Sequence, residues 1–445
     1  MKSSKDITKS QLRQFAQEYH KNPLWRAMTN VLAKTSAADI AYVNSRGAAI
    51  QPVFSVDIPT MKAVDQQSSG RCWIFAGLNL LRERIGKKFH IQEFEFSQSY
   101  VAFWDRLEKI NYFLEAMMTL ADRPVDDREV QWLLQQGIQD GGQWDMFVNI
   151  VRKYGLVPKY AMPETWQSSN TKPMNRLTNT KLRQYAAILR RMAAEGKDQD
   201  ALQREKNRML SEMYGFLCCC YGEPPERFDF EYADQNKEYK KKRDLSPDVF
   251  YQEYVGDILE EYVSIIHTPT GDKPFGHSYT VSWLGNTLDG NIVRYLNVEM
   301  RRFKEMVVKQ LTDGETVWFG CDCVQDDEQA VGVWDDRLHD YKTAFGMDFS
   351  LTKEERLDLR ESAVAHAMVL TGVNLADGKP DKWKVENSWG ENSGHKGYYV
   401  MTDSWFDEYV YQAVVQREYL SAQEIAAYEE EPKILSPWDP MGTLA

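Results

Sequence analysis

Residues 66–75 read Gln66-Gln67-Ser68-Ser69-Gly70-Arg71-Cys72-Trp73-Ile74-Phe75, and the rest of the chain is best understood from this segment. Its Ser-Ser-Gly portion predicts a turn, and the apolar spacing from Trp73 to Ile85 predicts a buried helix that begins at Cys72. At a helix N-terminus, free backbone N–H groups and the helix dipole favour a thiolate, the nucleophilic form of cysteine. The side-chain amide of Gln66 and the backbone N–H of Cys72 can both donate to a developing oxyanion. The alternative interpretation is a buried structural cysteine that opens a core helix.

A thiolate that attacks a carbonyl also needs a base and a group that orients the base. Of the seven histidines, His366 is the best candidate, because small residues flank it and an apolar strand follows it. Asn387 lies 21 residues later, so two antiparallel strands joined by a turn would place it beside His366. Asn387 Oδ1 would then accept from one ring nitrogen and leave the other facing Cys72, with Trp389 covering the hydrogen bond. Taken alone, His366 fits a core histidine and Trp389 an anchored turn, but the residues together predict nucleophilic catalysis.

The composition predicts a soluble protein with a sizeable core. The chain has 445 residues, is 43% hydrophobic and carries a formal net charge of −12, which argues against a protein that grips phosphate backbones. A chain of this length is expected to form about three structural units. The N-terminal residues lack the apolar segment of a leader peptide, and no apolar run reaches the ~18 residues of a membrane span. We therefore expect no membrane partner.

The cysteines predict a reducing, cytoplasmic compartment. They are Cys72, Cys218, Cys219, Cys220, Cys321 and Cys323. This spacing differs from that of a secreted disulfide framework. A metal site is the alternative, but adjacent cysteines cannot easily converge on one tetrahedral ion and no Cys-x-x-Cys pair occurs, so we expect no metal.

The order of patterns predicts a helical half that carries Cys72, then a helical insertion and a sheet-rich half. Expected helices cover residues 8–34, 72–89, 97–109, 111–135 and 145–154, and an extended arm covers residues 36–62. Expected strands cover residues 262–266, 278–281, 316–319, 367–373, 382–386 and 398–401. We interpret the basic run 237–243 as a solvated face, because Asp229, Glu231 and Asp234 are close in sequence; a nucleic-acid patch is the alternative.

These patterns divide the chain into five parts. They are residues 1–62 (N-terminal helix and arm), 63–162 (helical half with the nucleophile), 163–250 (inserted helical subdomain), 251–431 (sheet-rich half with His366 and Asn387) and 432–445 (C-terminal tail). Prolines 432, 437 and 440 prevent a regular helix in the tail. A frayed end is the usual fate of a terminus, but Trp438 and Met441 favour a docked tail.

Three segments resemble the papain-like cysteine peptidases: Gln66 to Phe75, His366-Ala367 and Asn387-Ser388-Trp389-Gly390. The resemblance implies an α+β papain-like fold, with a helical half, an antiparallel sheet or barrel half, and here an inserted helical subdomain. Ser69 stands where these peptidases usually have a disulfide cysteine, which fits a reducing compartment, and Arg71 stands where a small residue is usual. Cys72 and His366 lie 294 positions apart, roughly twice the ~130–150 of that group, and the insertion accounts for the excess.

These departures indicate one branch, the bleomycin hydrolase and aminopeptidase C family. The segments that look like this family are Ser69 to Trp73, Phe94 to Tyr100, Trp318 to Asp322 and Pro437 to Gly442, so the resemblance spans nearly the whole chain. It implies a nucleophile, an acid and base, an orienting amide and an oxyanion donor, which are Cys72, His366, Asn387 and Gln66, with no metal or organic cofactor. Gly141 and Gly142 match the backbone segment that hydrogen-bonds the substrate main chain in papain-like clefts, and Trp389 is expected on the substrate side with them.

The same resemblance implies a cytosolic cysteine aminopeptidase that acts on short peptides. In this family the tail lies in the active-site cleft, so the carboxylate of Ala445 is expected to meet the substrate's α-amino group. The implied partners are peptide substrates and further copies of the chain, in a homohexamer whose active sites face an internal cavity. The alternatives are a cysteine endopeptidase on the same scaffold and a relative that binds peptide or nucleic acid, although the acidity argues against nucleic acid.

Overall fold

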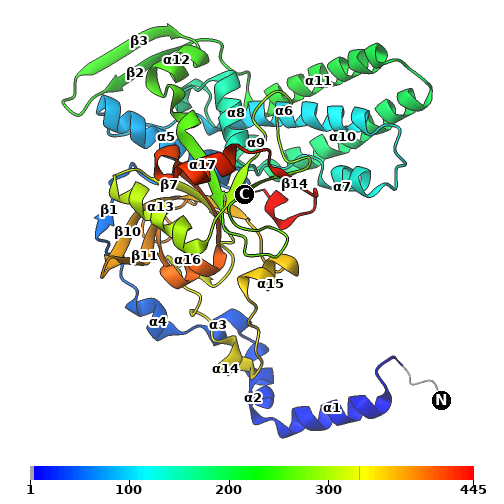
Figure 1. The fold of residues 1–445 in the computed structure, drawn as a ribbon, viewed down its shortest axis with the longest axis vertical. Coiled ribbons are helices and arrows are strands. Elements are labelled where there is room, and N and C mark those ends of the chain that lie inside the picture. The colour runs from blue at the N-terminus through cyan, green and yellow to red at the C-terminus, as the bar shows by residue number, and fades with distance from the viewer. Residues whose placement is uncertain (1–4, 330, 445) are drawn as a thin grey trace.

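Helix α5 (Cys72–Phe89) lies between a helical half and a large sheet (Figure 1). The computed structural model describes residues 5–329 and 331–444. Helix α5 begins and ends where the sequence predicts, because its apolar residues from Trp73 to Ile85 are buried and His90 ends it in the left-handed region at φ 57°. Arg71 stands at the N-cap without a side-chain capping bond, and Ile74 N donates instead to the Arg71 carbonyl at 3.0 Å, while the N–H groups of Cys72 and Trp73 donate to the Cys72 sulfur.

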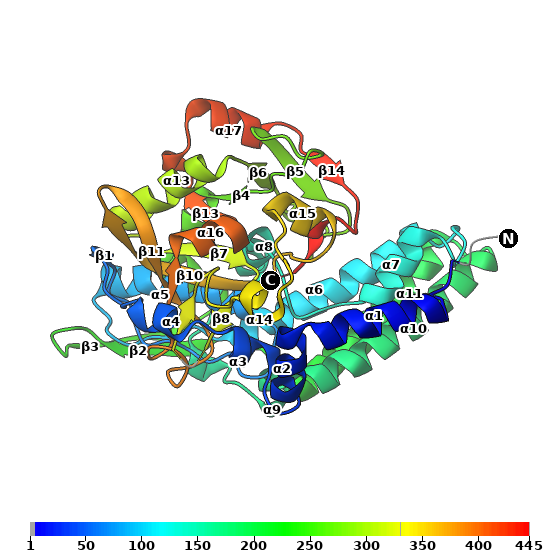
Figure 2. The same ribbon diagram turned by 90° about the horizontal axis from the view of Figure 1, so that it is seen from below.

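Seven further helices build the helical half. They are α6 (Gln98–Thr119), α7 (Arg128–Gln136), α8 (Trp144–Tyr154), α9 (Trp166–Ser169), α10 (Thr171–Ala194), α11 (Gln199–Tyr221) and α12 (Pro247–Tyr254) among the described residues. Helices α6, α10 and α11 lie side by side (Figure 2). One apolar core runs from α5 through α6 into Leu182 of α10 and Met209 of α11. The long helices therefore share the core of the nucleophile helix.

Two helix boundaries in this half differ from the prediction. Helix α6 begins after Ser97, whose hydroxyl accepts from Tyr100 N at 3.0 Å as expected, but it continues past residue 109. It does so because Ile110, Phe113 and nearby apolar residues extend the buried stripe. The single helix expected over residues 111–135 is interrupted, and α7 begins only after Asp127 caps it.

The last part of the inserted region, residues 228–245, forms strands, which corrects the prediction that the insertion is helical. Strands β2 (Phe228–Ala233) and β3 (Tyr239–Leu245) form an antiparallel hairpin there (Figure 1). Phe230 alternates with charged neighbours and packs on the helical half, which is the pattern of a half-buried strand. The basic residues lie on β3 and meet acids, with Lys241 Nζ 3.1 Å from Asp229 Oδ2.

The N-terminal region also departs from the prediction of one helix over residues 8–34. It forms α1 (Lys9–Lys21) and α2 (Pro23–Leu32), because Pro23 opens a new helix that Asn22 caps by accepting from Leu24 N at 3.0 Å. The expected extended arm contains the short elements α3 (Ala37–Ala41), α4 (Asn44–Ala49) and β1 (Val56–Asp57). Helix α1 projects away from the rest of the chain (Figure 1), whereas α2 packs on residues 341–345, where Trp25 Nε1 donates to Phe345 O at 2.9 Å.

The sheet half holds every predicted strand. Its strands are β4 (Tyr262–Ile266), β5 (His277–Val281), β6 (Tyr295–Asn297), β7 (Val317–Cys321), β8 (Asp327–Glu328), β9 (Val333–Trp334), β10 (His366–Ala376), β11 (Lys379–Glu386), β12 (Tyr398–Thr402), β13 (Val410–Gln416) and β14 (Lys433–Leu435). Within the described residues they are ordered β14-β5-β6-β4-β13-β7-β10-β11-β12-β9-β8, and β1 pairs with β10. Helices α13 (Met300–Thr312), α14 (Tyr341–Phe345), α15 (Lys353–Asp358), α16 (Asp403–Tyr409) and α17 (Ala422–Glu429) accompany the sheet. The α+β prediction is confirmed.

The sheet packs strands β10 and β7 against α5. Strand β10 begins at His366, which pairs with Cys321 of β7, and β11 returns antiparallel beside it to end at Glu386. Strand β14 adds the tail to the sheet by pairing parallel with β5.

In the described part of the chain, no helix is long and apolar enough to cross a membrane.

Candidate active site

Cys72 is a buried thiol, 3% exposed, at the first position of α5. The backbone N–H groups of Ala367, Trp73 and Cys72 hydrogen-bond the sulfur and lower its pKa, as expected at a helix N-terminus. Burial has the larger effect and raises the pKa of Cys72 to about 11. The helix terminus alone therefore does not produce the thiolate that the sequence suggests. The contact with Ala367 places the sulfur one residue from His366.

His366 and Asn387 lie side by side, as predicted. The distance from His366 Nε2 to Asn387 Oδ1 is 2.8 Å, and Ser388 N donates to the same oxygen at 2.8 Å. Because the amide oxygen only accepts, this bond requires the hydrogen on Nε2 and leaves a lone pair on Nδ1. The ring of Trp389 stacks on His366 with centroids 5.1 Å apart. Trp389 therefore covers the base, as expected.

Burial also disfavours the charged form of the base. It lowers the pKa of His366 to about 4, against an opposing effect of the Asn387 hydrogen bond. Each charge alone is thus unfavourable in this enclosed site, since Cys72 resists losing a proton and His366 resists gaining one. Transfer of a proton from the sulfur to the imidazole would create both charges at once, and opposite charges at close range offset each other's desolvation.

The side-chain amide of Gln66 is held at both ends by hydrogen bonds to its neighbours. It is 7% exposed, its Nε2 donates to Ser69 O at 2.6 Å, and its Oε1 accepts from Ser388 Oγ at 2.6 Å. The second amide N–H has no acceptor in the described part of the chain. Ser388 therefore links the segment that carries Asn387 to the loop before Cys72.

Gly141 and Gly142 lie beside the first turn of α5. A Cβ on Gly142 would stand 2.6 Å from the ring of Trp73, so only glycine allows this approach. The carbonyl of Gly141 accepts from the buried Lys109 Nζ at 2.7 Å. The segment is thus fixed against both α5 and α6.

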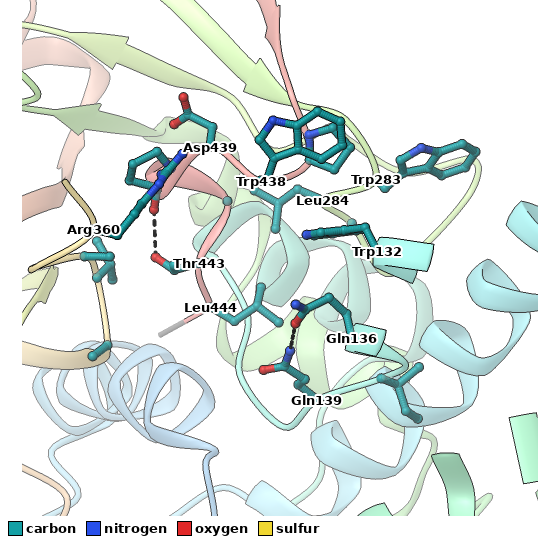
Figure 3. Close-up of a pocket in the computed structure, with 18 of the residues that line it drawn as sticks. Trp132, Gln136, Gln139, Trp283, Leu284, Arg360, Trp438, Asp439, Thr443 and Leu444 are labelled. Atoms are coloured by element: carbon teal, nitrogen blue, oxygen red, sulfur yellow. Dashed lines mark hydrogen bonds between the residues drawn. The ribbon is translucent and has the colours of Figure 1, made fainter. Parts of the chain in front are cut away.

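The tail borders a cavity of about 720 Å³ next to these residues (Figure 3). Its walls include Trp132 of α7, Trp283 after β5, Ala365 and Leu444, so the helical half, the sheet half and the tail all border it. Ala445, the residue expected to meet the substrate amine, lies outside the described residues.

Polar contacts hold the tail along its length. Asp439 Oδ2 lies 3.0 Å from Lys273 Nζ, and both side chains are buried. Gln143 Nε2 donates to Thr443 O at 2.8 Å, directly after the Gly141–Gly142 pair. The guanidinium of Arg128 lies 3.5 Å above the Trp438 ring.

The sequence did not identify Gln143, Lys109 or Lys273 as site residues. Gln143 adjoins the glycine pair and could have been found there, whereas Lys109 and Lys273 are separated from their partners by about 30 and about 170 residues. Among the described residues, no group of three His, Cys, Asp or Glu side chains is arranged to hold a metal ion.

A family model described as the Peptidase C1-like family matches residues 6–442. The chain belongs to the Peptidase C1-like family. It is a cysteine peptidase with the papain-like fold. Aminopeptidase C of Listeria monocytogenes is 46% identical over 440 residues, which covers 99% of each chain. Bleomycin hydrolase of Homo sapiens is 39% identical over 453 residues, which covers 100% of each chain.

A solved structure agrees with this assignment. The crystal structure of PepW from Lactobacillus rhamnosis HN001 has a TM-score of 0.97 and 45% identity, and the match covers 99% of this chain and 100% of that one. The resemblance to the bleomycin hydrolase and aminopeptidase C family is confirmed.

Proposed function

We propose that this cysteine peptidase removes N-terminal residues from short peptides through a thioester intermediate. The observation that carries the proposal is the His366–Asn387 hydrogen bond beneath Trp389, one residue from the contact between Ala367 and the Cys72 sulfur. Relatives that cover the whole chain are named aminopeptidase C, which supports action at the N-terminus.

In acylation, His366 Nδ1 takes the proton of Cys72 and the sulfur attacks the scissile carbonyl carbon. The carbonyl oxygen becomes an oxyanion that accepts from the Cys72 backbone N–H and the free N–H of Gln66. The imidazolium, held by Asn387 Oδ1, then donates its Nδ1 proton to the leaving nitrogen as the C–N bond breaks. The acyl group remains on sulfur as a thioester.

In deacylation, water takes the place of the released amine. His366 Nδ1 accepts a proton from the water as its oxygen attacks the thioester carbon. When the tetrahedral intermediate collapses, the C–S bond breaks, the acid leaves and the sulfur regains the proton. Gln66 and the Cys72 N–H stabilise the oxyanion of this step in the same way.

The tail supplies the reason for exopeptidase action. A free α-amine has a pKa of about 7.7–8 and is mostly cationic at neutral pH. A carboxylate within about 4 Å of it, at an effective dielectric constant near 20, contributes up to roughly 4 kcal/mol before desolvation. The contacts of Thr443 and Asp439 with the cleft support a role for the Ala445 carboxylate as this partner.

The test compares a fluorogenic aminoacyl amide with its N-blocked twin, using the intact protein and a variant that ends at Gly442. We expect the intact protein to cleave only the free amine and the shortened protein to gain the blocked substrate. If the intact protein cleaves the blocked substrate well, the protein is the endopeptidase alternative. If neither protein cleaves either substrate and Cys72 resists thiol labelling, the catalytic roles proposed here are wrong.

We also propose that the protein works in the cytoplasm as a homohexamer whose active sites face an internal cavity, and that it binds no nucleic acid. The whole-chain likeness to bleomycin hydrolase supports the assembly, and the net charge of −12 supports the absence of nucleic acid. Light scattering after gel filtration tests the homohexamer, since the mass of a single chain at micromolar concentration would contradict that assembly.

A further inference from the structure

Asp140 joins four parts of the chain, yet the mechanism above makes no use of it. Its side chain is 9% exposed. Oδ2 accepts from the Gly70 backbone N–H at 3.1 Å and from the Thr171 hydroxyl. Oδ1 accepts from Asn175 Nδ2 at 3.0 Å and forms an ion pair with Arg106. The carboxylate is therefore fully engaged and its charge is compensated.

Asp140 contacts the loop that precedes Cys72. Gly70 approaches so closely that a Cβ on it would stand 3.0 Å from the Asp140 Cβ. The backbone carbonyl of Asp140 also accepts from Trp73 Nε1 at 2.8 Å. One residue thus anchors both the loop that carries Gln66 and the first turn of α5.

Helix α6 fixes the position of Asp140 itself with two buried cations one turn apart. Arg106 pairs with the Asp140 side chain. Lys109, 5% exposed, donates to the flanking carbonyls, at 3.1 Å to Gln139 O and 2.7 Å to Gly141 O. The segment beside the nucleophile is therefore held rigidly by α6.

A second ion pair supports the same loop. Arg71, 1% exposed, donates to both carboxylate oxygens of Glu164 at 3.1 and 2.9 Å, and its Nε donates to Ser69 Oγ at 3.0 Å. This contact accounts for an arginine where papain-like peptidases have a small residue. Ser69, at the place of their disulfide cysteine, takes part in it. Hydrogen bonds and an ion pair of Arg71 thus hold this loop at the position where papain-like peptidases usually have a disulfide.

We propose that Asp140 is a positioning residue for the reaction. Through Gly70 it holds the loop that presents the two oxyanion donors, and so it sets their distance from the substrate carbonyl. The inference rests on the proposed function, because it requires Cys72 and Gln66 in the roles given above. The supporting contacts from Thr171 and Asn175 place the start of α10, within the inserted region, behind the active site.

A purely electrostatic role of Asp140 would act with the opposite sign. Its negative charge raises the pKa of the Cys72 thiol, after burial and in opposition to the backbone N–H groups. Neutralising it would make the thiolate easier to form. Removal of the charge should therefore favour the nucleophile while it disturbs the oxyanion donors.

The experiment measures two reactions of Asp140→Asn. One is hydrolysis of the aminoacyl amide, and the other is alkylation of Cys72 by iodoacetamide across pH, which displaces iodide and forms no oxyanion. We expect kcat to fall about 30- to 300-fold, near the loss of one oxyanion donor, with KM changed less than about threefold. Alkylation should be no slower, and its pH midpoint should move downward. A kcat within threefold of wild type, or an equal fall of both rates, would overturn the inference.

Two further variants keep the test decisive. Asp403→Asn is the matched control, because Asp403 lies 2.8 Å from the partly buried Lys304 and remote in sequence from the loop, and its kcat should equal that of wild type. Thr171→Val removes one donor to Asp140 without loss of volume, and should lower kcat about fivefold with a melting temperature only a few degrees lower. If Asp140→Asn does not fold, an unchanged kcat in Thr171→Val overturns the inference. If the wild-type protein hydrolyses no amide, the proposed function falls and the inference falls with it.

Discussion

Replacing Glu386 with glutamine should stabilise the protein, and the gain should grow with pH. The Glu386 side chain is 1% exposed, next to Asn387 in sequence. Its Oε1 accepts from Asn79 Nδ2 at 2.9 Å and from Arg82 Nη2 at 2.7 Å, both on α5. Burial raises the pKa of Glu386 to about 7, although the charge of Arg82 lowers it. This carboxyl therefore loses its proton reluctantly in the folded protein.

The sign and size of the effect follow from this pKa. An acid whose pKa is raised on folding binds its proton more tightly in the folded state, so the free energy of unfolding falls as pH rises from about 4.5 to about 7. At about 1.36 kcal/mol per pKa unit, the loss reaches about 3 kcal/mol at pH 8 and about 1 kcal/mol at pH 5.5. Glutamine cannot ionise, and its Oε1 can keep both hydrogen bonds. The variant should therefore recover these amounts.

Urea denaturation at the two pH values measures the difference. The gain of Glu386→Gln should be about 2 kcal/mol larger at pH 8 than at pH 5.5. Glu305→Gln is the control, because Glu305 is half exposed beside Arg301 and should change stability by less than about 0.5 kcal/mol at both values. A gain that does not depend on pH, or a loss at pH 8, would show that the attraction of Arg82 outweighs burial.

Three other outcomes test the site. Gln66→Ala should lower kcat about 10²–10³-fold while Cys72 is still alkylated at the wild-type rate, and a parallel loss of both would exclude Gln66 as oxyanion donor. Asp439→Asn weakens the ion pair with Lys273 that holds the tail, so steady-state kinetics should show cleavage of the N-blocked amide rising about tenfold relative to the free amine; a constant ratio would contradict this. Because burial lowers the pKa of His366 to about 4, the unfolded chain binds this proton at higher pH than the folded chain does. Unfolding free energy should then fall by up to about 3 kcal/mol from pH 6.5 to 4, and urea titrations of His366→Gln should lack this part of the acid slope.

The parts of the fold that local pattern controls could be predicted from the sequence. Helix α5 was predicted to the residue because its buried positions follow a helical period and a turn precedes it. Strands β10 and β11 were also predicted, and with them the neighbourhood of His366 and Asn387, because the turn between them is short. These are interactions between residues close in sequence.

Other features depend on partners that a single sequence does not pair. The strand that contains Phe230 was not predicted, because a run of basic residues follows it. The end of one helix and the start of the next at Pro23 were also missed, because the helical spacing of apolar residues continues across this position. Asp140 directly precedes the Gly141–Gly142 pair that the sequence singled out, yet its partner Arg106 lies on α6. The burial of a side chain depends on the whole fold. The sequence therefore did not predict that burial raises the pKa of the Cys72 thiol more than the helix terminus lowers it.

The apolar core that continues from α5 through α6 into α10 and α11 limits how this enzyme can be recombined with its relatives. A crossover placed at the edges of residues 163–250 would cut through one packed interior, because Leu182 and Met209 complete the surface of α6. Chimeras should therefore exchange α6, α10 and α11 together, whereas α1 projects from the rest of the chain and can be exchanged on its own. Residues 163–250 therefore share the hydrophobic core of the rest of the enzyme and do not form a separately packed unit.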